Sequence, residues 1–308
     1  MNLMTSKIIF MGTPEFSVPS LKLLNLEHKV LSVYTQPPRK KSRGQKIIKS
    51  AVHVEAENLK LPIRFPENLN NESDYKFIKD SNAKFVVVVA YGQIIPKKFL
   101  NINNLIFLNI HASLLPRWRG AAPIQRSIMK MDKKTGISIM KIVPKLDAGP
   151  YMLQKSINIE LKDNFMSLSN KLSEIGSNMI LEAISLLEKG KSQFTDQDEK
   201  LATYAKKINK KESQIIWNEL SQKLIAKING LNPYPGAWFE HNGNRIKILD
   251  AEIFDDKGKA GEVLSNNLII GCKDKAIKIN LIQKEGKKVI DTKSFLAGYK
   301  ISKGDILK

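Results

Sequence analysis

Two polar side chains stand two positions apart in the segment Asn109-Ile110-His111, at the end of an apolar run from Leu105 to Ile110. A run of this composition predicts a buried strand. Because side chains alternate between the two faces of a strand, Asn109 and His111 are expected on one face and Ile110 on the other. A carboxamide can donate to a developing oxyanion, and a neighbouring imidazole can exchange a proton with an attacking or leaving nitrogen. The pair therefore supplies two of the three parts that acyl transfer to an amine requires.

The third part is a carboxylate that orients the imidazole and stabilises its charged form. Asp147 is the candidate, because it stands in Leu146-Asp147-Ala148-Gly149 just beyond a second apolar run. Each of these residues also has a plainer interpretation. Asn109 and His111 could be strand-end groups satisfied by nearby backbone, and Asp147 could be an ordinary loop or cap aspartate.

A longer block favours the chemical interpretation. From Asn109 the chain continues without interruption through Ser113-Leu-Leu-Pro116 to Arg117-Trp-Arg-Gly-Ala-Ala-Pro-Ile-Gln125. This block, together with the Leu146 to Gly149 segment, resembles the folate-dependent formyltransferase family, and the resemblance extends over essentially the whole chain. It implies that the catalytic residues are Asn109, His111 and Asp147. It also implies a set of folate-binding residues, namely Tyr91, Gly92, Ser113, Leu114, Leu115 and Pro116.

The sequence departs from the family pattern beside the aspartate. Ala148 replaces the usual Thr of the L-D-T-G motif, and Lys145 replaces a frequent Gly. Hydrogen bonding around Asp147 is therefore expected to differ from that of the family.

The reaction implied by the resemblance transfers the formyl group of the cosubstrate 10-formyltetrahydrofolate to the α-amino group of methionine esterified to initiator tRNA. The amine would attack the formyl carbon directly, without a covalent enzyme intermediate and without a metal. The Asn109 amide would stabilise the oxyanion, a contact worth roughly 3 to 4 kcal/mol of barrier in comparable sites. His111 would move the proton between the two nitrogens, and Asp147 would orient it directly or through a water.

A basic segment runs from Thr35 to Lys46 and contains five basic residues, two prolines and no acidic residue. Such a segment cannot bury a face, so we expect an exposed loop, which by itself is more often merely solvated. In formyltransferases that act on tRNA, a basic loop at this place, beginning with Thr-Gln-Pro, contacts the acceptor stem. The resemblance therefore implies a set of tRNA-binding residues, namely Arg39, Lys40, Lys41, Arg43 and, in a later basic segment, Lys207. Pro38 departs from the family pattern and leaves the loop geometry open.

The elements around these residues predict an α/β domain with a doubly wound, mostly parallel, Rossmann-like sheet. A strand at Lys7 to Met11, a glycine turn, a helix and a strand at Val30 to Tyr34 form its opening. Gly12-Thr13-Pro14 is not the G-x-G-x-x-G fingerprint, so no bound dinucleotide is expected. The β-branched run from Lys84 to Ala90 predicts the central strand, because a continuous apolar run requires both faces to be covered. Tyr91 follows at its carboxyl end, where such sheets bind ligands.

The pattern of hydrophobic and turn residues changes at Ile215. A helix at Ser221 to Asn229 is followed by short alternating strands separated by Gly, Asn or Asp turns, which predicts a small β-barrel. The resemblance identifies it as an OB-type barrel that contacts tRNA. Tyr234 and Trp238, in a proline-rich turn before the strands, are expected to be structural. We therefore expect a catalytic domain at 1–189, a basic linker at 190–213 and a tRNA-binding domain at 214–308.

The composition sets broader limits. The 308 residues carry a formal net charge of +20, which would attract a polyanion such as RNA, although a genome-wide Lys-rich bias would also produce it. One cysteine, Cys272, and four histidines suggest neither a disulfide framework nor a metal cluster. No apolar run is long enough to span a bilayer. A monomer in a reducing cytoplasm is expected.

Two other functions stay open. One is a related formyltransferase that acts on an amino sugar nucleotide or a purine intermediate, against which the basic loop and the run from Arg119 to Arg126 favour tRNA. The other is a non-catalytic RNA-binding protein that retains the scaffold. It would bind tRNA with a strong inverse salt dependence and show no turnover. The intact set of Asn109, His111 and Asp147 speaks against it.

Overall fold

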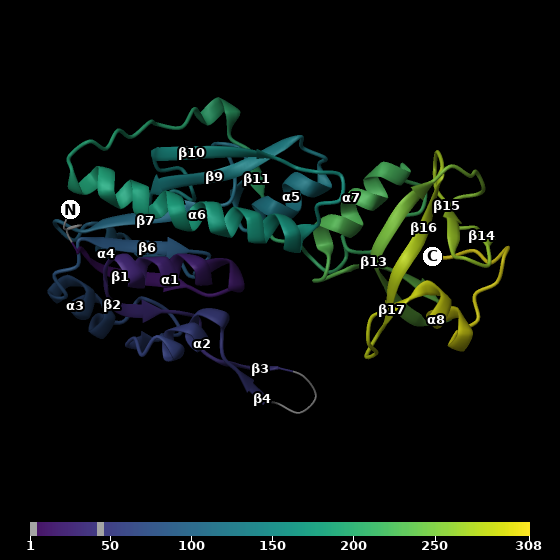
Figure 1. Ribbon diagram of the computed structural model, residues 1–308, viewed down its shortest axis with the longest axis horizontal. Coiled ribbons are helices and arrows are strands. Elements are labelled where there is room, and N and C mark those ends of the chain that lie inside the picture. Colours follow the sequence, from purple (N-terminus) through teal and green to yellow (C-terminus); the bar gives the residue numbers. More distant parts are fainter. Residues whose placement is uncertain (1–4, 42–45) are drawn as a thin grey trace. The chain divides into compact units, whose positions relative to one another are not determined.

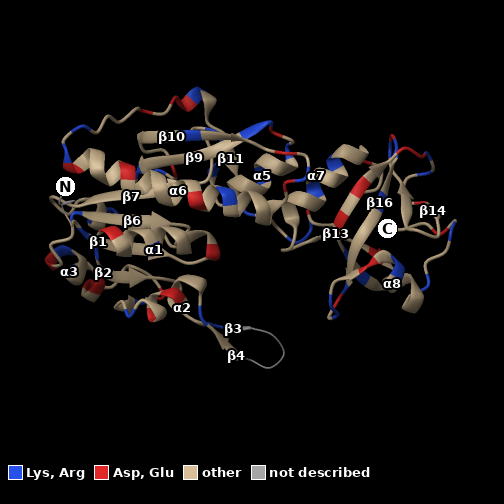
Figure 2. Cartoon of the chain, in the orientation of Figure 1, with Lys and Arg blue, Asp and Glu red and all other residues tan. Residues whose placement is uncertain are grey.

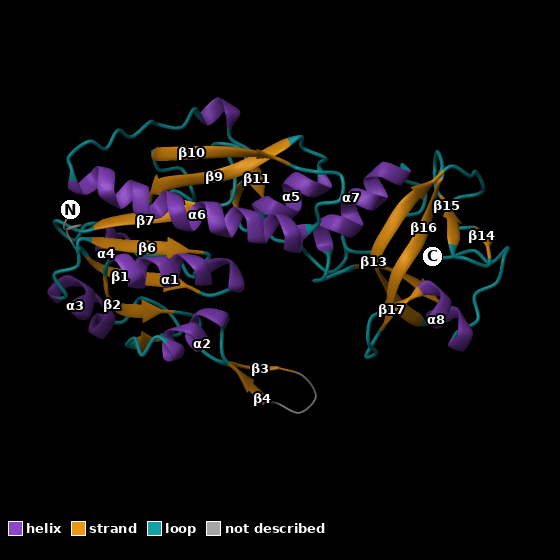
Figure 3. Cartoon of the chain, viewed as in Figure 1, coloured by secondary structure: helices purple, strands orange, loops and turns teal. Residues whose placement is uncertain are grey.

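The computed structural model describes residues 5–41 and 46–308, which form two compact units (Figure 1). The first unit comprises Met1–Gly120, Gly136–Ile157 and Ser169–Tyr204, and the second comprises Ala121–Thr135, Asn158–Leu168 and Ala205–Lys308. Helices and strands alternate in the first unit, whereas strands dominate the second (Figure 3). Lys and Arg occur on both units, intermixed with Asp and Glu (Figure 2). The domain limits expected from the sequence stay a prediction.

The elements that lie wholly or mostly in the first unit are, in chain order, β1 (Lys7–Gly12), η1 (Glu15–Ser17), α1 (Val18–Glu27), β2 (Lys29–Tyr34), β3 (Arg39–Lys41), β4 (Lys46–Ile48), α2 (Ala51–Asn58), β5 (Ile63–Arg64), α3 (Glu72–Asp80), β6 (Phe85–Val89), α4 (Lys97–Leu100), β7 (Ile106–His111), β8 (Arg119–Gly120), β9 (Lys134–Lys141), β10 (Tyr151–Asn158), α6 (Phe165–Glu188) and η2 (Glu199–Leu201). The second unit contains α5 (Pro123–Met129), α7 (Ser221–Leu231), β12 (Ala237–His241), β13 (Asn244–Phe254), β14 (Val263–Ser265), β15 (Ile269–Gly271), β16 (Ala276–Lys284), β17 (Ile290–Asp291) and α8 (Thr292–Gly298), and the two residues of β11 (Tyr204–Ala205) belong one to each unit.

The first unit is built on a seven-stranded sheet in the order β10-β9-β7-β6-β1-β2-β5. Neighbouring strands from β7 to β5 run parallel, and β9 runs antiparallel to β7. The predicted central strand is confirmed, since β6 is the middle strand and all five of its residues are buried. The fold class predicted from the sequence, a mostly parallel α/β sheet followed by a β-rich unit, is confirmed.

Both faces of this sheet are covered, which explains why its strands read as continuous apolar runs. On one face the side chains of Val86, Val88 and Phe107 share a core cluster with Ile78 of α3 and Phe99 of α4. The opposite face is covered by α6. A Cβ on Gly176 of that helix would lie 2.7 Å from Cγ2 of Ile110, so the glycine is needed for the helix to pack this closely on β7.

The flanks of the basic segment are more regular than the sequence predicted. Residues Arg39–Lys41 pair with Lys46–Ile48 as the antiparallel strands β3 and β4, where the sequence predicted only a loop. Alternation of apolar residues is the signal for a strand, and this charged pair lacks it. The same reason explains why the sequence did not predict β10, whose residues are half-buried or exposed along its whole length.

The second unit is a curved antiparallel sheet in the order β12-β13-β16-β15-β14, with β17 beside β16. The segment after α8 closes it. Lys308 exchanges backbone hydrogen bonds with Glu240 of β12, while the N–H of Val263 in β14 donates to the carbonyl of Asp305. The two edge strands are therefore bridged by one C-terminal segment, as the predicted barrel requires. Within the described ranges, no helix combines the length and the apolar character needed to cross a bilayer.

Candidate active site

Asn109 and His111 lie at the carboxyl end of β7, and their side chains share one face of the strand. Asn109 pairs with Met140 of β9 and Val88 of β6, and His111 pairs with Ser138. Ile110 between them packs toward α6 on the other face. The alternation expected from the sequence is therefore observed. Asn109 is half-buried, whereas only 5% of His111 is exposed.

The two ring nitrogens of His111 have different partners. Nε2 lies 2.9 Å from the carbonyl oxygen of Trp118. Because a carbonyl oxygen can only accept, Nε2 carries the proton of the neutral ring, and Nδ1 is left as the proton acceptor. Nδ1 lies 3.8 Å from Oδ2 of Asp147, which is longer than a hydrogen bond. The histidine is thus held by backbone on one side and faces the carboxylate on the other.

The backbone shapes the turn that carries Asp147. This residue has a φ of 45°, in the left-handed region that non-glycine residues rarely adopt, and its Oδ2 accepts from the N–H of Gly120 at 2.8 Å. Gly149 is required for a different reason. A Cβ at that position would lie 1.9 Å from the carbonyl oxygen of Lys141 on β9. The L-D-x-G segment therefore forms a turn that packs against the sheet and places the Asp147 carboxylate opposite His111.

A side-chain network fixes the same turn from a distant segment. The Nε2 of Gln197 donates to the backbone carbonyls of Asp147 and Gly149, at 2.9 and 2.7 Å. Its Oε1 accepts from Nε of Arg119 at 2.9 Å. The Arg119 side chain is completely buried, and its two terminal nitrogens donate to the carboxylate of Glu199 at 3.2 and 3.0 Å. A fixed arginine therefore orients the glutamine that holds the Asp147 turn.

Lys145 joins this network. Its Nζ lies 2.7 Å from the same Glu199 carboxylate, so the residue that replaces the family's glycine has a defined partner here. Hydrogen bonds from Arg119 and then Lys145 lower the pKa of Glu199 to about 2. Sequence reasoning counted Arg119 in the run that favours tRNA, whereas the structure buries it against Glu199; it gave Lys145 no role and missed Gln197 and Glu199. No local signal marks those two, because their partners stand about 50 to 80 residues earlier in the chain.

The turn Ser113 to Pro116, predicted to bind folate, lies next to the histidine. Ser138, the strand partner of His111, donates from Oγ to the carbonyl of Ser113 and accepts from the N–H of Leu115. Gln154 donates to the carbonyl of Leu115 at 2.8 Å and to Ser138 Oγ at 2.9 Å. The structure therefore brings this turn and His111 together through one buried serine.

Tyr91 and Gly92, the other predicted folate ligands, follow β6 at the same edge of the sheet. The Tyr91 side chain is buried in the core cluster beneath α3, and burial raises the pKa of its hydroxyl. Its carbonyl accepts from the Thr13 hydroxyl at 2.7 Å and from the Gln36 amide at 3.3 Å. Gly92 is exposed, with a φ of 83°. The exposed group at this place is therefore Gly92, whereas the ring and the carbonyl of Tyr91 are engaged by the protein itself.

The predicted tRNA-binding residues belong to both units. Arg39 is exposed, and one of its terminal nitrogens donates to Gln36 at 3.1 Å. Lys40 and Lys41 belong to β3, while Arg43 lies outside the described residues. In the second unit Lys207 is exposed, and Arg126 holds its segment by donating to the carbonyls of Lys206 and Lys207 and to the Glu212 carboxylate. Arg126 thus holds the segment that carries Lys207.

Two segments of this chain match known protein families. Residues 6–184 match the family described as Formyl transferase, and residues 207–300 match the description Formyl transferase, C-terminal domain. Together these ranges cover most of the chain and both of its units.

Curated relatives match over nearly the full length. The chain is 50% identical over 304 residues to the methionyl-tRNA formyltransferase of Pelagibacter ubique (strain HTCC1062), with 98% of each chain covered. It is 42% identical over 303 residues to the methionyl-tRNA formyltransferase of Jannaschia sp. (strain CCS1), with 98% of this chain and 100% of that protein covered.

Solved structures share the fold at much lower identity. HypX from Aquifex aeolicus, in complex with tetrahydrofolic acid, matches 98% of this chain with a TM-score of 0.67 and 19% identity, and this chain spans about half of the HypX chain (50%). WlaRD, a sugar 3N-formyl transferase, matches with a TM-score of 0.66 and 17% identity, with 92% of this chain and 99% of that chain covered.

Proposed function

This chain belongs to the formyl transferase family, and on that premise we propose that it transfers the formyl group of 10-formyltetrahydrofolate to the α-amino group of methionyl initiator tRNA. The relatives that match over nearly the whole chain are methionyl-tRNA formyltransferases. The observation that carries the proposal at the level of residues is the free Nδ1 of His111. It faces Asp147, and it stands on the same strand face as the Asn109 carboxamide.

The residues present fit a folate cosubstrate. Ala90 and Gly92, just after the central strand, are both exposed with positive φ, so their backbone groups are accessible at the ligand-binding edge of the sheet. The Ser113 to Pro116 turn is held beside His111 by Ser138. When bound, the cosubstrate supplies a formyl group attached to nitrogen. Among the described residues, no group of three His, Cys, Asp or Glu side chains is placed to hold a metal ion.

The three polar groups divide the work of the transfer. The Asn109 amide donates to the oxyanion that develops as the amine attacks the formyl carbon. His111 accepts the proton of the attacking amine at Nδ1, because Nε2 is occupied by the Trp118 carbonyl. Asp147, 3.8 Å from Nδ1, stabilises the imidazolium that forms and then leaves it free to return the proton to the leaving nitrogen.

Gln197 acts through Asp147 as a positioning residue. Asp147 has a backbone conformation that a β-carbon disfavours, and such conformations persist only where surrounding contacts determine them. The two hydrogen bonds from Gln197 to the Asp147 turn supply those contacts. We assign to Arg119 the role of fixing Gln197 and the role of a paired cation for Glu199.

The nucleic-acid partner would be bound by basic residues of both units. Arg39, at the base of the β3–β4 hairpin, and Lys207, in the segment held by Arg126, are exposed. We assign contacts with initiator tRNA to both, together with Lys40, Lys41 and Arg43. We propose a catalytic domain at 1–189, a linker at 190–213 and a tRNA-binding domain at 214–308. A monomer in the cytoplasm, where initiator tRNA is used, is consistent with this role.

The deciding experiment measures formyl transfer from 10-formyltetrahydrofolate by the purified chain. Methionyl initiator tRNA, methionyl elongator tRNA and an amino sugar nucleotide serve as acceptors, with His111→Ala as the chemical control. The proposal expects turnover on initiator tRNA that is lost in the control. Turnover on the sugar nucleotide alone, or salt-sensitive tRNA binding without any turnover, contradicts it.

A further inference from the structure

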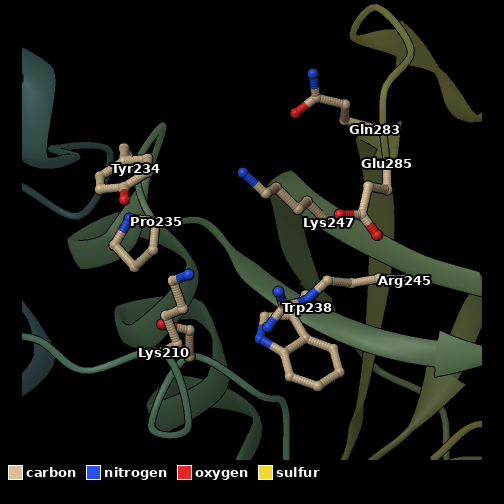
Figure 4. Close-up of a pocket in the computed structure, with 9 residues that line it drawn as sticks. Lys210, Tyr234, Pro235, Trp238, Arg245, Lys247, Gln283 and Glu285 are labelled. Atoms are coloured by element: carbon tan, nitrogen blue, oxygen red, sulfur yellow. The ribbon is translucent and has the colours of Figure 1, made fainter. Parts of the chain in front are cut away.

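A pocket of about 230 Å³ lies in the second unit, outside the site described above. Figure 4 shows the Arg245 side chain reaching toward the Trp238 ring and the Lys247 side chain extending toward Tyr234, with Lys210 and Pro235 on the Tyr234 side. The pocket is completed by Ser213, Tyr234, Gln283 and Glu285.

Strand register places the pocket on the outer face of the barrel. Trp238 of β12 pairs with Lys247 of β13, which pairs in turn with Gln283 of β16. Ile246 and Ile248 alternate with Lys247 and are completely buried in the core. The side chains of Trp238, Lys247 and Gln283 are therefore fixed to a platform of three paired strands.

Two donors in this pocket have no acceptor. Nε1 of Trp238 and Nε of Arg245 are buried, and neither has a hydrogen-bond partner within residues 5–41 and 46–308. The Arg245 guanidinium lies 3.8 Å from the centroid of the indole ring, so the two groups hold each other in place by a cation–π contact. A buried donor without an acceptor is costly in a folded protein, so a pair of them signals a missing acceptor.

The charges of the pocket are also unbalanced. Lys210, Arg245 and Lys247 supply three positive charges against the single carboxylate of Glu285. Burial, and then the neighbouring Arg245, lower the pKa of Lys247. A bound anion would offset both effects, since it adds a negative charge beside two crowded cations and accepts from the unpaired donors.

We propose that this pocket binds a phosphate group, and that the RNA backbone is its source. A phosphate offers several acceptor oxygens to a site with two unpaired N–H donors and three cations. Tyr234 on the rim is 73% exposed and lies 6.0 Å from Nζ of Lys247, where its ring is free to stack on a neighbouring base or ribose. Only the choice of RNA over a free phosphate ester rests on the proposed function.

The test observes the indole N–H groups of the full-length chain, labelled with 15N at tryptophan, by NMR. Trp238→Phe assigns the pocket signal. Trp217 provides an internal control, because its Nε1 is also buried without a partner in the described structure but belongs to the apolar core. Inorganic phosphate, compared with chloride at equal ionic strength, is expected to shift the Trp238 signal and leave that of Trp217 in place. Absence of any shift at Trp238 overturns the site.

Further titrations identify the source of the phosphate, and two variants test the role of Lys247. Uncharged initiator tRNA is expected to perturb the Trp238 signal at far lower concentration than adenosine 5′-monophosphate or inorganic phosphate. Equal potency of the mononucleotide overturns the RNA assignment. Lys247→Gln should weaken the phosphate response, whereas Lys278→Gln, on the same sheet but paired with Glu252 at 3.1 Å, should not. No formyl transfer is needed for this readout, so the pocket and the proposed function can fail separately.

Discussion

The two polar sites of this molecule differ in how their groups are satisfied. At the end of β7 the groups around the imidazole have partners: His111 Nε2 contacts a carbonyl, Asp147 accepts from the N–H of Gly120, and Gln197 uses both ends of its amide. In the barrel pocket, Trp238 and Arg245 have buried donors without acceptors among the described residues. The groups that orient His111 are therefore paired in the folded chain, whereas these two donors of the pocket are not.

This difference matches the demands of two kinds of site. A catalytic site lowers a barrier when its dipoles and charges are fixed before the reaction, so that no reorganisation is needed in the transition state. A binding site gains affinity when its donors are unsatisfied in the free protein and satisfied in the complex. Nδ1 of His111 lies 3.8 Å from Asp147, too far for a hydrogen bond, which leaves it available as the proton acceptor that the first site requires.

Replacing Asp147 by Asn should produce the largest effect. An amide oxygen can still accept from the Gly120 N–H, so the fold is expected to persist. That oxygen takes the place of Oδ2, the atom that faces Nδ1 of His111, so the substitution keeps the hydrogen bond and removes the negative charge opposite the imidazole. We expect kcat to fall about 10²- to 10⁴-fold, as for other losses of positioned proton transfer. Single-turnover formyl transfer measures the fall. Near-normal turnover would remove Asp147 from the mechanism.

Asn109→Ala tests the other half of the same site. Loss of one oxyanion donor is expected to lower kcat about 10²- to 10³-fold while thermal unfolding changes little. Asp80→Asn, at the exposed end of α3, is the matched control for both variants. A fall in the control as large as in the site variants would show that the assay reports folding rather than chemistry.

The Gln197→Met variant tests whether the hydrogen bonds that hold the Asp147 turn affect the catalytic rate. Methionine has a similar length but cannot hold the carbonyls of Asp147 and Gly149, so the turn should loosen. We expect kcat to fall about tenfold with KM nearly unchanged, because the residue acts through Asp147. Gln222→Met, exposed on α7, is the control.

A double-mutant cycle separates positioning from general stability. If Gln197 acts only through the Asp147 carboxylate, adding Gln197→Met to Asp147→Asn should cost little further activity. If the fold-losses of kcat in the two single variants multiply in the double variant, Gln197 has a structural role that is independent of Asp147.

The sequence predicted the central features of the first site because they are local. Alternation placed Asn109 and His111 on one face of β7, and the β-branched run identified β6 as the central strand. The Gln197 network could not be predicted in this way. Its segment is polar and lacks periodicity, and hydrogen bonds to residues 50 and 78 positions away leave no trace in local pattern.

The pocket escaped prediction for a related reason. Tyr234 and Trp238 stand in a proline-rich turn, for which a packing role was expected, and Trp238 is indeed half-buried. Tyr234, however, is largely exposed, and the Arg245 that stacks on Trp238 comes from the neighbouring strand. The register between neighbouring strands determines which basic side chain stacks on which aromatic ring, and the sequence does not give this register.

The salt dependence of tRNA binding tests whether the pocket binds a phosphate group of the RNA. Lys247→Gln should weaken binding by about threefold to tenfold and reduce the slope of log K against log salt by about one, the value expected for one lost phosphate contact. Arg245→Lys keeps the charge but removes the Nε donor and should have an intermediate effect. Lys278→Gln serves as the control, and a slope unchanged in Lys247→Gln would show that no phosphate is bound there.

The smallest expected effect is a pH-dependent loss of stability in Glu199→Gln. Hydrogen bonds from Arg119, and then Lys145, hold the pKa of Glu199 at about 2, below its ordinary value of 4.5. A depressed carboxyl pKa stabilises the fold fully above the unfolded value and loses that contribution as the pH falls toward the folded value. Urea midpoints of the wild type and the variant should therefore differ at pH 7 and converge between about pH 4.5 and pH 2. Glu182→Gln, exposed on α6, controls for the general loss of one charge. A difference that stays constant down to pH 3 would mean that Arg119 holds Gln197 without help from the charge of Glu199, and the network would then be ordered by packing alone.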